Sequence, residues 1–281
     1  MRVSAAATHE YLYTRVATYS GMGGPEKADY SDPQHPSTPT RAGRFVITSI
    51  GPHTTMQVGT GARVWSAVAW GTPLRLDPKG VVQIKLPGKD WQRLTSLPAW
   101  RHLDHDQARV ASDIEDRNLL LWTPVLGAFT KNPKETPIGF YRKIPDKWVF
   151  NDFGHVAVKY YRDVNHNGHQ DATEAERTLS DFIHTTPNHE LFELLNQKAN
   201  AGISSPLTAS HGCVHALPSE VDELIQGGYL RVGGTFVVHS YTERIVGVFS
   251  EKTTEMRTDS REVHFFPREN KLIVYMVTRL S

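Results

Sequence analysis

The sequence predicts an α+β fold that is mainly β, because strand-like segments outnumber helical ones. Short runs in which apolar and polar residues alternate, or in which β-branched residues gather, recur along the chain between turns rich in Gly and Pro. Helical periodicity is confined to a few segments. With 281 residues, 39% of them hydrophobic and 22% charged, the chain is long enough and apolar enough to bury a large core.

The strand-like runs are, in chain order, residues 43–49, 64–70, 81–86, 139–144, 155–161, 235–240, 243–249, 262–266 and 271–278. The last two flank residues 267–270, Pro-Arg-Glu-Asn, a composition that predicts a hairpin loop. Helices are expected at residues 104–117, 189–199 and 218–225. Pro218 suits the first turn of the last helix.

The charge balance and the hydropathy argue against two classes of partner. Lys and Arg total 31 against 30 Asp and Glu, a formal net charge of +1, so the chain lacks the basic field that binds nucleic acid. Its most apolar window, residues 119–129, contains Pro124 and is shorter than the roughly 20 residues that span a bilayer, so no membrane span is expected. Residues 1–10 lack the apolar stretch of a signal peptide, and none is predicted.

Cys213 is the only cysteine of the chain, which excludes an intramolecular disulfide. Free cysteine is most often a small buried apolar residue. Here His211 and His215 flank the thiol, and Gly212 lets the backbone approach a ligand closely. A nucleophilic thiol needs a base within hydrogen-bond reach and a site that favours the thiolate. These neighbours favour a nucleophile, with inert packing as the alternative.

Residues 210–213, Ser-His-Gly-Cys, followed by an apolar residue, resemble the signature of the L,D-transpeptidase catalytic-domain family, cysteine enzymes that remodel bacterial peptidoglycan. Upstream, residues 182–187 (Phe-Ile-His-Thr-Thr-Pro) resemble the segment that supplies the family's catalytic histidine. Downstream, the helix from Pro218 and residues 233–238 (Gly-Gly-Thr-Phe-Val-Val) resemble the family's closing helix and strand. The resemblance implies a mixed β-sandwich of L,D-transpeptidase type, here with a long insertion.

The resemblance also implies roles for the residues of the site. Cys213 would be the nucleophile, His184 its base, and Thr185 the residue whose backbone carbonyl orients the imidazole. The N–H groups of Gly212 and Cys213 would stabilise the oxyanion of the tetrahedral intermediate. His189 is a competing candidate for the base, but its place at the start of a helix favours a surface position.

Three further residues around the thiol, Ser210, His211 and His215, are expected to contact substrate. His215 stands where the family generally has Arg or Asn, so it is expected to anchor a substrate carboxylate with a charge that titrates near neutrality. For His211, fixing the turn through a hydrogen bond is an equal alternative.

Two segments resemble the family's Thr-Pro-x-Gly element, which precedes an aromatic strand. Residues 136–140, Thr-Pro-Ile-Gly-Phe, match it directly, and residues 38–45, Thr-Pro-Thr-Arg-Ala-Gly-Arg-Phe, match it loosely. The sequence leaves open which of the two occupies the family position.

A second pattern predicts a calcium site. Residues 163–174, Asp-Val-Asn-His-Asn-Gly-His-Gln-Asp-Ala-Thr-Glu, match the calcium-loop pattern D-x-[DN]-x-[DN]-G-x5-E. The expected oxygen ligands are Asp163, Asn165, Asn167, the carbonyl of His169, Asp171 and, with both carboxylate oxygens, Glu174. A polar turn without an ion is the alternative. The Ca²⁺ would be structural, and the chemistry at Cys213 needs no cofactor.

The expected organisation is one elaborated catalytic domain. Residues 1–49 would form its N-terminal part, residues 50–131 an insertion or subdomain, residues 132–241 the catalytic core with the calcium loop, and residues 242–281 the C-terminal strands that complete the domain.

The function expected from the resemblance is peptidoglycan L,D-transpeptidation, in which a tetrapeptide stem acylates Cys213 and an amine resolves the thioester. Hydrolysis by an L,D-carboxypeptidase, or exchange of D-amino acids on the same stems, uses the same groups. A rival of another class is a calcium-stabilised cell-wall-binding module without catalysis. The expected partners are peptidoglycan stem peptides, the expected location is the periplasm or cell envelope, and carbapenems are expected to acylate the cysteine.

Overall fold

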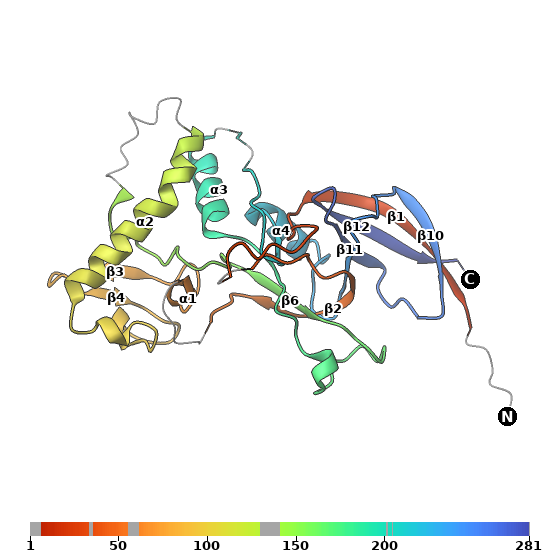
Figure 1. The fold of residues 1–281 in the computed structure, drawn as a ribbon, viewed down its shortest axis with the longest axis horizontal. Coiled ribbons are helices and arrows are strands. Elements are labelled where there is room, and N and C mark those ends of the chain that lie inside the picture. Colours follow the sequence, from red (N-terminus) through yellow and green to blue (C-terminus); the bar gives the residue numbers. More distant parts are fainter. Residues whose placement is uncertain are drawn as a thin grey trace. The chain divides into compact units, whose positions relative to one another are not determined.

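The computed structural model of the chain describes residues 7–33, 36–55, 62–129, 141–200, 202–203 and 205–280. It is an α+β structure that is mainly β, with a nine-stranded mixed sheet, a three-stranded sheet and a few helices (Figure 1). The predicted fold class is therefore confirmed. Residue contacts divide the chain into two compact units. The first comprises residues 1–50, 158–184 and 207–281, and the second comprises residues 51–157 and 185–206.

The nine-stranded sheet has the strand order β10-β1-β12-β11-β9-β2-β6-β7-β8. Its strands, in chain order, are β1 (His9–Ser20), β2 (Gly43–Gly51), β6 (Ala157–Tyr161), β7 (Ile183–His184), β8 (Val214–His215), β9 (Thr235–Val238), β10 (Val248–Thr253), β11 (Arg261–Phe266) and β12 (Lys271–Arg279). The pairs β11/β9 and β7/β8 are parallel. Strand β1 lies antiparallel between β10 and β12.

Strand β1 was not predicted from the sequence. Tyr11 and Tyr13 alternate with more exposed residues and are buried, as expected for a strand with one face on a core. Tyr11 lies opposite Arg279 in the register with β12, so the partner of this strand lies near the other end of the chain. The pairing shifts between Arg15 and Ala17 at a bulge.

The predicted hairpin loop is confirmed. Residues 267–270 join β11 to β12, and Asn270 adopts the left-handed conformation that a tight turn requires, with φ of 55°. The two strands pair from Arg261 opposite Met276 to Phe266 opposite Lys271, and most of their residues are buried. This hairpin lies between β1 and β9 in the sheet.

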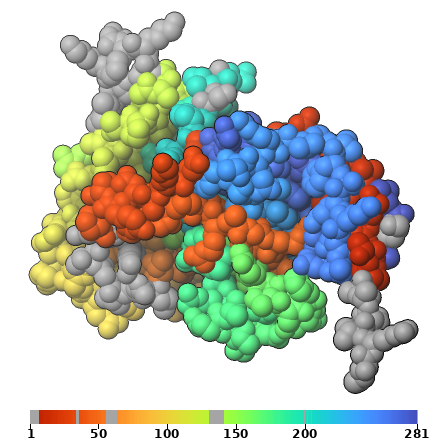
Figure 2. Space-filling model, turned by 45° about the vertical axis from the view of Figure 1, so that its right-hand side comes forward, coloured from red at the N-terminus to blue at the C-terminus, as the bar shows by residue number. Residues whose placement is uncertain are grey.

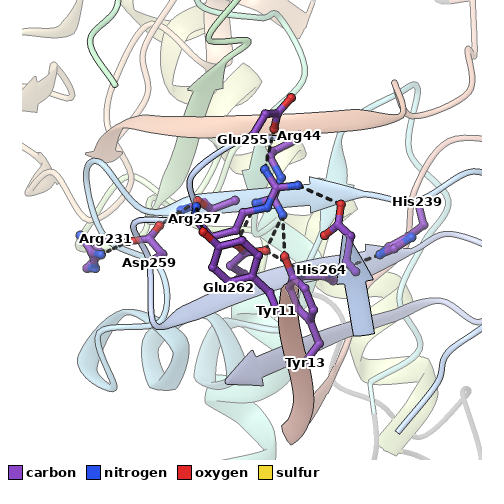
Figure 3. A network of polar contacts seen from close by, with 12 residues as sticks. Tyr11, Tyr13, Arg44, Arg231, His239, Glu255, Arg257, Asp259, Glu262 and His264 are labelled. Carbon is purple, nitrogen blue, oxygen red and sulfur yellow. Dashed lines mark hydrogen bonds and ion pairs between the residues drawn. The ribbon is translucent and has the colours of Figure 1, made fainter. Parts of the chain in front are cut away.

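A buried charge network joins β2 to β11 across β9 (Figure 3). Arg44 Nη1 lies 2.8 Å from Glu262 Oε1, and Arg44 Nη2 donates to Glu262 Oε2 at 2.9 Å and to the Tyr13 hydroxyl at 3.1 Å. Glu262 is fully buried. Burial by itself raises the pKa of Glu262, but the hydrogen bond from His264 and the charge of Arg44 outweigh it, so the pKa lies below its usual value.

The network continues through two histidines. His264 Nε2 lies 3.0 Å from Glu262 Oε2, so this nitrogen donates to the carboxylate. Burial lowers the pKa of His264, which keeps the ring neutral and makes its Nδ1 an acceptor. His239 Nε2 lies 2.9 Å from that Nδ1 and therefore donates, while His239 Nδ1 faces Glu243 Oε1 at 2.9 Å. The chain of contacts fixes the residues that follow β9 against β11.

Helix α4 (Pro218–Gln226) begins as predicted, with Pro218 in its first turn. Its buried residues Val221 and Leu224 recur at helical spacing. On its other face, Glu223 accepts a hydrogen bond from the Tyr19 hydroxyl at 2.9 Å, and Glu220 accepts one from the Ser20 N–H at 2.8 Å. The helix is thereby tied to the end of β1.

The second unit combines a small sheet with helices. Strands β3 (Leu74–Leu76), β4 (Val82–Ile84) and β5 (Gln92–Arg93) form the three-stranded sheet. The helices are α1 (Ala62–Trp65), α2 (Gln107–Phe129) and α3 (Pro187–Ala199), and α2 and α3 lie side by side (Figure 1). The aromatic rings of Trp65, Trp100 and Trp148 pack in its core, with centroids 5.2 Å apart for the first two and 5.8 Å for the last two.

Several predicted elements differ from the observed ones. Residues 64–70, predicted as a strand, contain the end of α1 and a turn. The run is apolar because it packs in a core, and its apolar residues do not alternate with polar ones as those of a half-buried strand do. Residues 243–249 are largely a turn before β10. The helix predicted at 104–117 starts at Gln107 and extends to Phe129, with Pro124 inside it. In the predicted strand 139–144, residues 139 and 140 lie outside the described residues.

The compact units cross the expected domain boundaries. The first unit draws on the N-terminal part (1–49), on the core (132–241) and on the C-terminal strands (242–281), whereas the second contains the proposed insertion (50–131) together with residues 132–157 and 185–206. Among the described residues, no helix is long and apolar enough to cross a membrane.

Replacing Glu262 by Ala should destabilise the protein by about 3 kcal/mol or more, because Arg44 would be left as a largely buried charge without its carboxylate partner. The free energy of unfolding from urea denaturation measures the effect. Glu10→Ala is the matched control, since its ion pair with Lys252 at 3.9 Å is exposed and contributes less than about 1 kcal/mol. Equal losses in the two variants would contradict the role of the network.

Candidate active site

The pairing of β7 with β8 places the predicted nucleophile and base. The two strands run in parallel, with Ile183 opposite Val214 and His184 opposite His215. The Phe182 carbonyl accepts a hydrogen bond from the Val214 N–H at 2.8 Å, and the His184 carbonyl accepts one from the Ala216 N–H at 3.0 Å. These bonds fix the register between the two segments that the sequence motifs identified.

Cys213 lies in a bend directly before β8, and Phe182 directly precedes β7. The Phe182 N–H donates to the Cys213 Sγ at 3.4 Å, and His184 is two residues beyond Phe182. The side chains of His184 and His215, which lie opposite each other in the pairing, share one face of the sheet. The rings of His184 and His215 meet edge to face, with centroids 4.8 Å apart.

Ser210 shapes the turn that carries the thiol. Its Oγ accepts a hydrogen bond from the Gly212 N–H at 3.1 Å and donates to the Cys213 carbonyl. Ser210 is 2% exposed, so the structure gives it a role in holding the turn, in place of the expected contact with substrate. The Gly212 N–H, expected to face the oxyanion, is directed at Ser210.

Gly212 is nevertheless required by the geometry of the turn. Its φ of 137° lies in a region that favours glycine, and a β-carbon at this position would lie 3.0 Å from Thr38 Oγ1. Thr38 donates to the His211 carbonyl from its N–H at 3.3 Å and from its Oγ1 at 3.1 Å. His211 itself is exposed, so its backbone, and not its side chain, makes these contacts.

The contacts of Thr38 show which of the two Thr-Pro segments lies beside the turn of Cys213. Residues 38–45 lead into β2 and touch the turn that carries Cys213. Residues 136–140 lie outside the described residues. The looser of the two matches is therefore the one that the structure places beside the thiol.

The environment of Cys213 raises the pKa of its thiol to about 11. Burial is the main cause, and the negative charge of Asp181 adds to it, while the hydrogen bond from the Phe182 N–H acts in the opposite direction. The expectation of a site that favours thiolate is thus not met in this structure. At neutral pH the group is a thiol, and it becomes a nucleophile only when a base removes its proton.

Three residues near the thiol were not found from the sequence: Tyr160, Asp181 and Arg41. Tyr160 is fully buried, and its hydroxyl has no hydrogen-bond partner among the described residues. Burial raises the pKa of Tyr160, and the charges of Asp181 and Cys213 raise it further. Asp181 lies between Ser180 and Phe182, both of which contact Sγ, and forms an ion pair with Arg41 at 3.7 Å. The position of Asp181, directly before Phe182-Ile183-His184, was a signal that could have been used.

Thr185 and His189 belong to the second unit. The Thr185 hydroxyl donates to Glu190 Oε1 and accepts from the His155 N–H at 3.3 Å. Its carbonyl as the orienting group for the imidazole stays a prediction. His189 is 2% exposed and lies in α3, which begins at Pro187 after the N-cap Thr186, so the expected surface position is wrong.

The predicted calcium loop follows β6 and curls around its own side chains. Asp163 accepts hydrogen bonds from the Asn167 N–H at 3.3 Å and the Gly168 N–H at 2.8 Å. The side-chain amides of Asn165 and Asn167 both donate to Asp171 Oδ2, at 2.6 and 3.2 Å. Gly168 has a φ of 77°, as the sharp turn requires. Four of the expected ligands are thus brought together.

The last expected ligand, Glu174, lies elsewhere. Its side chain is 83% exposed and pairs with Arg177 at 2.6 Å. Glu176 closes the loop instead, accepting hydrogen bonds from the Val164 N–H at 2.8 Å and the Asp171 N–H at 2.9 Å. Its pKa is lowered chiefly by the hydrogen bond from Asp171. His169 donates its N–H to Asn167 Oδ1 at 2.7 Å, and ligation through its carbonyl stays a prediction.

A cavity of about 1090 Å³ lies in the first unit between this loop and the charge network. Asp163, His166 and Asn167 line it from the loop, and Arg44 and His239 line it from the sheet. His166 Nε2 reaches Glu255 Oε1 at 3.6 Å, which ties the loop to the residues after β10. In Figure 2 the green loop segment adjoins the blue segment of β10. None of residues 210–215 lines this cavity, so it is distinct from the thiol site.

Comparison with known proteins finds no matching family model, no similar curated protein and no similar solved structure. The chemistry of the site therefore rests on its residues and their geometry.

The rate of Cys213 alkylation by iodoacetamide should keep rising as the pH increases beyond 9, because burial raises the pKa of the thiol to about 11 and the thiolate is the reactive form. Asp181→Asn removes a negative charge beside the sulfur and should shift this profile to lower pH. Glu10→Gln, at a partly exposed carboxylate of the same unit, should leave the profile unchanged. A wild-type rate that levels off near pH 7 would show that a thiolate is already present.

Proposed function

We propose that this protein is a cysteine acyltransferase that acts on peptidoglycan stem peptides, with L,D-transpeptidation as its reaction. The observation that carries the proposal is the parallel register of β7 and β8, which brings the segment of His184 beside the turn that carries Cys213. The Ser-His-Gly-Cys turn, its resemblance to the L,D-transpeptidase family and the packing of residues 38–45 on that turn support it.

In the proposed reaction, His184 removes the proton of the Cys213 thiol as the sulfur attacks the carbonyl carbon of an L,D peptide bond. The new bond joins Sγ to the carbonyl carbon, and the bond from that carbon to nitrogen breaks. His184 returns the proton to the leaving amine, so the terminal D-amino acid departs and a thioester remains. An amine of a second stem then attacks the thioester and frees the thiol.

The raised pKa of the Cys213 thiol fits general-base catalysis better than a thiolate present before substrate binds. Tyr160 and Asp181 complete the environment of the sulfur. The same groups with water as acceptor would make an L,D-carboxypeptidase, and with a free D-amino acid an exchange enzyme. Because the substrate is a cell-wall polymer, the proposal implies an extracytoplasmic location.

We also propose that residues 163–171 bind Ca²⁺ as a structural ion. Asp163, Asn165, Asn167, Asp171 and the His169 carbonyl supply the hard oxygen donors that Ca²⁺ prefers. The side chains of Asn165 and Asn167 both lie within hydrogen-bond distance of Asp171, so the oxygens of the three are close enough together to share one ion. The ion would hold together the loop that joins β6 to β7, the strand that carries His184.

Incubation with purified tetrapeptide muropeptides tests the reaction, with products followed by mass spectrometry. Cross-linked dimers indicate transfer, and tripeptides indicate hydrolysis. Cys213→Ala should abolish turnover, and His184→Ala should lower its rate by about a hundredfold or more, as expected for loss of a general base. His105→Ala, an exposed histidine of the second unit, is the control and should retain full activity.

Folded wild-type protein that produces neither product and forms no covalent adduct with a carbapenem would rule out the catalytic proposal. Binding of intact peptidoglycan by such an inactive protein would instead support a calcium-stabilised cell-wall-binding module.

Calcium should raise the stability of the protein, by about 2.7 kcal/mol at a hundredfold excess over Kd, because the ion binds the folded loop. Thermal unfolding with and without CaCl₂ measures the change. Asp163→Ala should abolish the calcium effect, whereas Glu174→Gln should preserve most of it, since Glu174 pairs with Arg177 outside the loop. An unchanged melting temperature, together with no heat of binding in calorimetry, would discard the site.

A further inference from the structure

The proposed reaction removes one residue from the end of a peptide, so its substrate carries a carboxylate close to the scissile bond. Only the C–N, N–Cα and Cα–C bonds of the last residue separate the reacting carbonyl carbon from the carboxylate carbon, a distance of at most about 4 Å. A residue that recognises this terminal carboxylate must therefore lie within several ångströms of the Cys213 sulfur. Arginine is the side chain that pairs best with a carboxylate, through two parallel hydrogen bonds.

Arg41 pairs with Asp181, which lies between the two residues that contact the sulfur, and it stands on a fixed stretch of backbone. Thr38 donates to the His211 carbonyl, and the Thr40 Oγ1 accepts from the Gly24 N–H at 2.9 Å. The Ala42 carbonyl accepts a hydrogen bond from Arg162 at 3.0 Å. The residues on both sides of Arg41 are thus held in place, while its own side chain is 53% exposed. A pre-ordered backbone lowers the entropic cost of binding a ligand.

The guanidinium group of Arg41 has its terminal nitrogens available. Its Nε lies 3.7 Å from Asp181 Oδ2, and neither Nη has a partner among the described residues. Asp181 also reaches the thiol turn, because a β-carbon on Gly212 would lie 3.6 Å from Asp181 Oδ1. The ion pair therefore stands beside the Gly212-Cys213 peptide, with Asp181 setting the direction of the arginine.

His215, expected from the sequence to anchor the carboxylate, can do so only with a protonated ring. Its Nδ1 lies 2.8 Å from the Thr208 carbonyl, and a carbonyl only accepts, so Nδ1 carries a hydrogen. In a neutral ring the other nitrogen is then an acceptor, which repels a carboxylate. Arg41 keeps its charge at every physiological pH.

We propose that Arg41 binds the free C-terminal carboxylate of the donor peptide and thereby restricts the site to bonds one residue from a C-terminus. This inference rests on the proposed function. The substrate class is a stem peptide that ends in a free D-amino acid, and a stem already cross-linked through that residue is excluded.

Calorimetry on the unreactive Cys213→Ala protein tests the proposal without requiring turnover. The probes are a synthetic tetrapeptide stem with a free C-terminal carboxylate and the same peptide with a C-terminal amide. The carboxylate should bind about tenfold more tightly or better, the size expected for a charge-assisted pair of hydrogen bonds. Adding Arg41→Ala should remove this preference by weakening only the carboxylate peptide, and Arg41→Lys should restore part of it.

Arg244→Ala is the matched control, because Arg244 is an exposed arginine that pairs with Glu269 and should leave both affinities unchanged. Equal affinity of the Cys213→Ala protein for the two peptides, or a preference that survives Arg41→Ala, would overturn the role of Arg41. Absence of turnover in the wild-type protein is a separate result and would count against the acyltransferase reaction, whichever way the two peptides bind.

Discussion

The buried pair between Arg44 and Glu262 is the interaction on which the central sheet depends. It joins β2 to β11 over the intervening strand β9, at a place where Glu262 has no access to water. Two charges in such a place are tolerated only because each satisfies the other, with the Tyr13 hydroxyl and His264 completing the contacts. The same pair fixes the start of β2, and the residues just before β2 are those that pack on the thiol turn. The buried ion pair and the turn that carries Cys213 are thus connected through β2 and the residues before it.

The surroundings of Cys213 make its thiol less reactive, because they raise the pKa of the group. A partly buried thiol with an aspartate nearby holds its proton firmly, and the protonated form is a poor nucleophile. In the proposed reaction a base removes the proton, and His184 is the candidate because its strand pairs with the strand that follows Cys213.

The sequence predicted those parts of the site that lie in short continuous segments. Ser210 to Cys213 and Ile183-His184 each carry a local pattern, and the structure places the two side by side. Arg41 and Tyr160 come from separate segments and share no pattern, so only their folded positions reveal them. The same reason explains why β1 escaped notice, since its burial depends on β12 near the far end of the chain. Glu176 replaced Glu174 because backbone N–H groups, which a side-chain pattern does not show, select the carboxylate that closes the loop.

The arrangement of strands β1, β10 and β12 has a consequence for biosynthesis. Strand β1 pairs with β10 on one edge and β12 on the other, so both partners leave the ribosome long after it. During translation β1 stays unpaired, with its tyrosines exposed, while more than two hundred residues are added, including the whole of the second unit. Contacts between such distant segments form slowly, because closing a long loop carries an entropic cost before any contact compensates it. The nascent chain therefore passes through a stage in which a complete second unit coexists with an unfinished sheet, and this stage is the one most exposed to aggregation and to the action of chaperones.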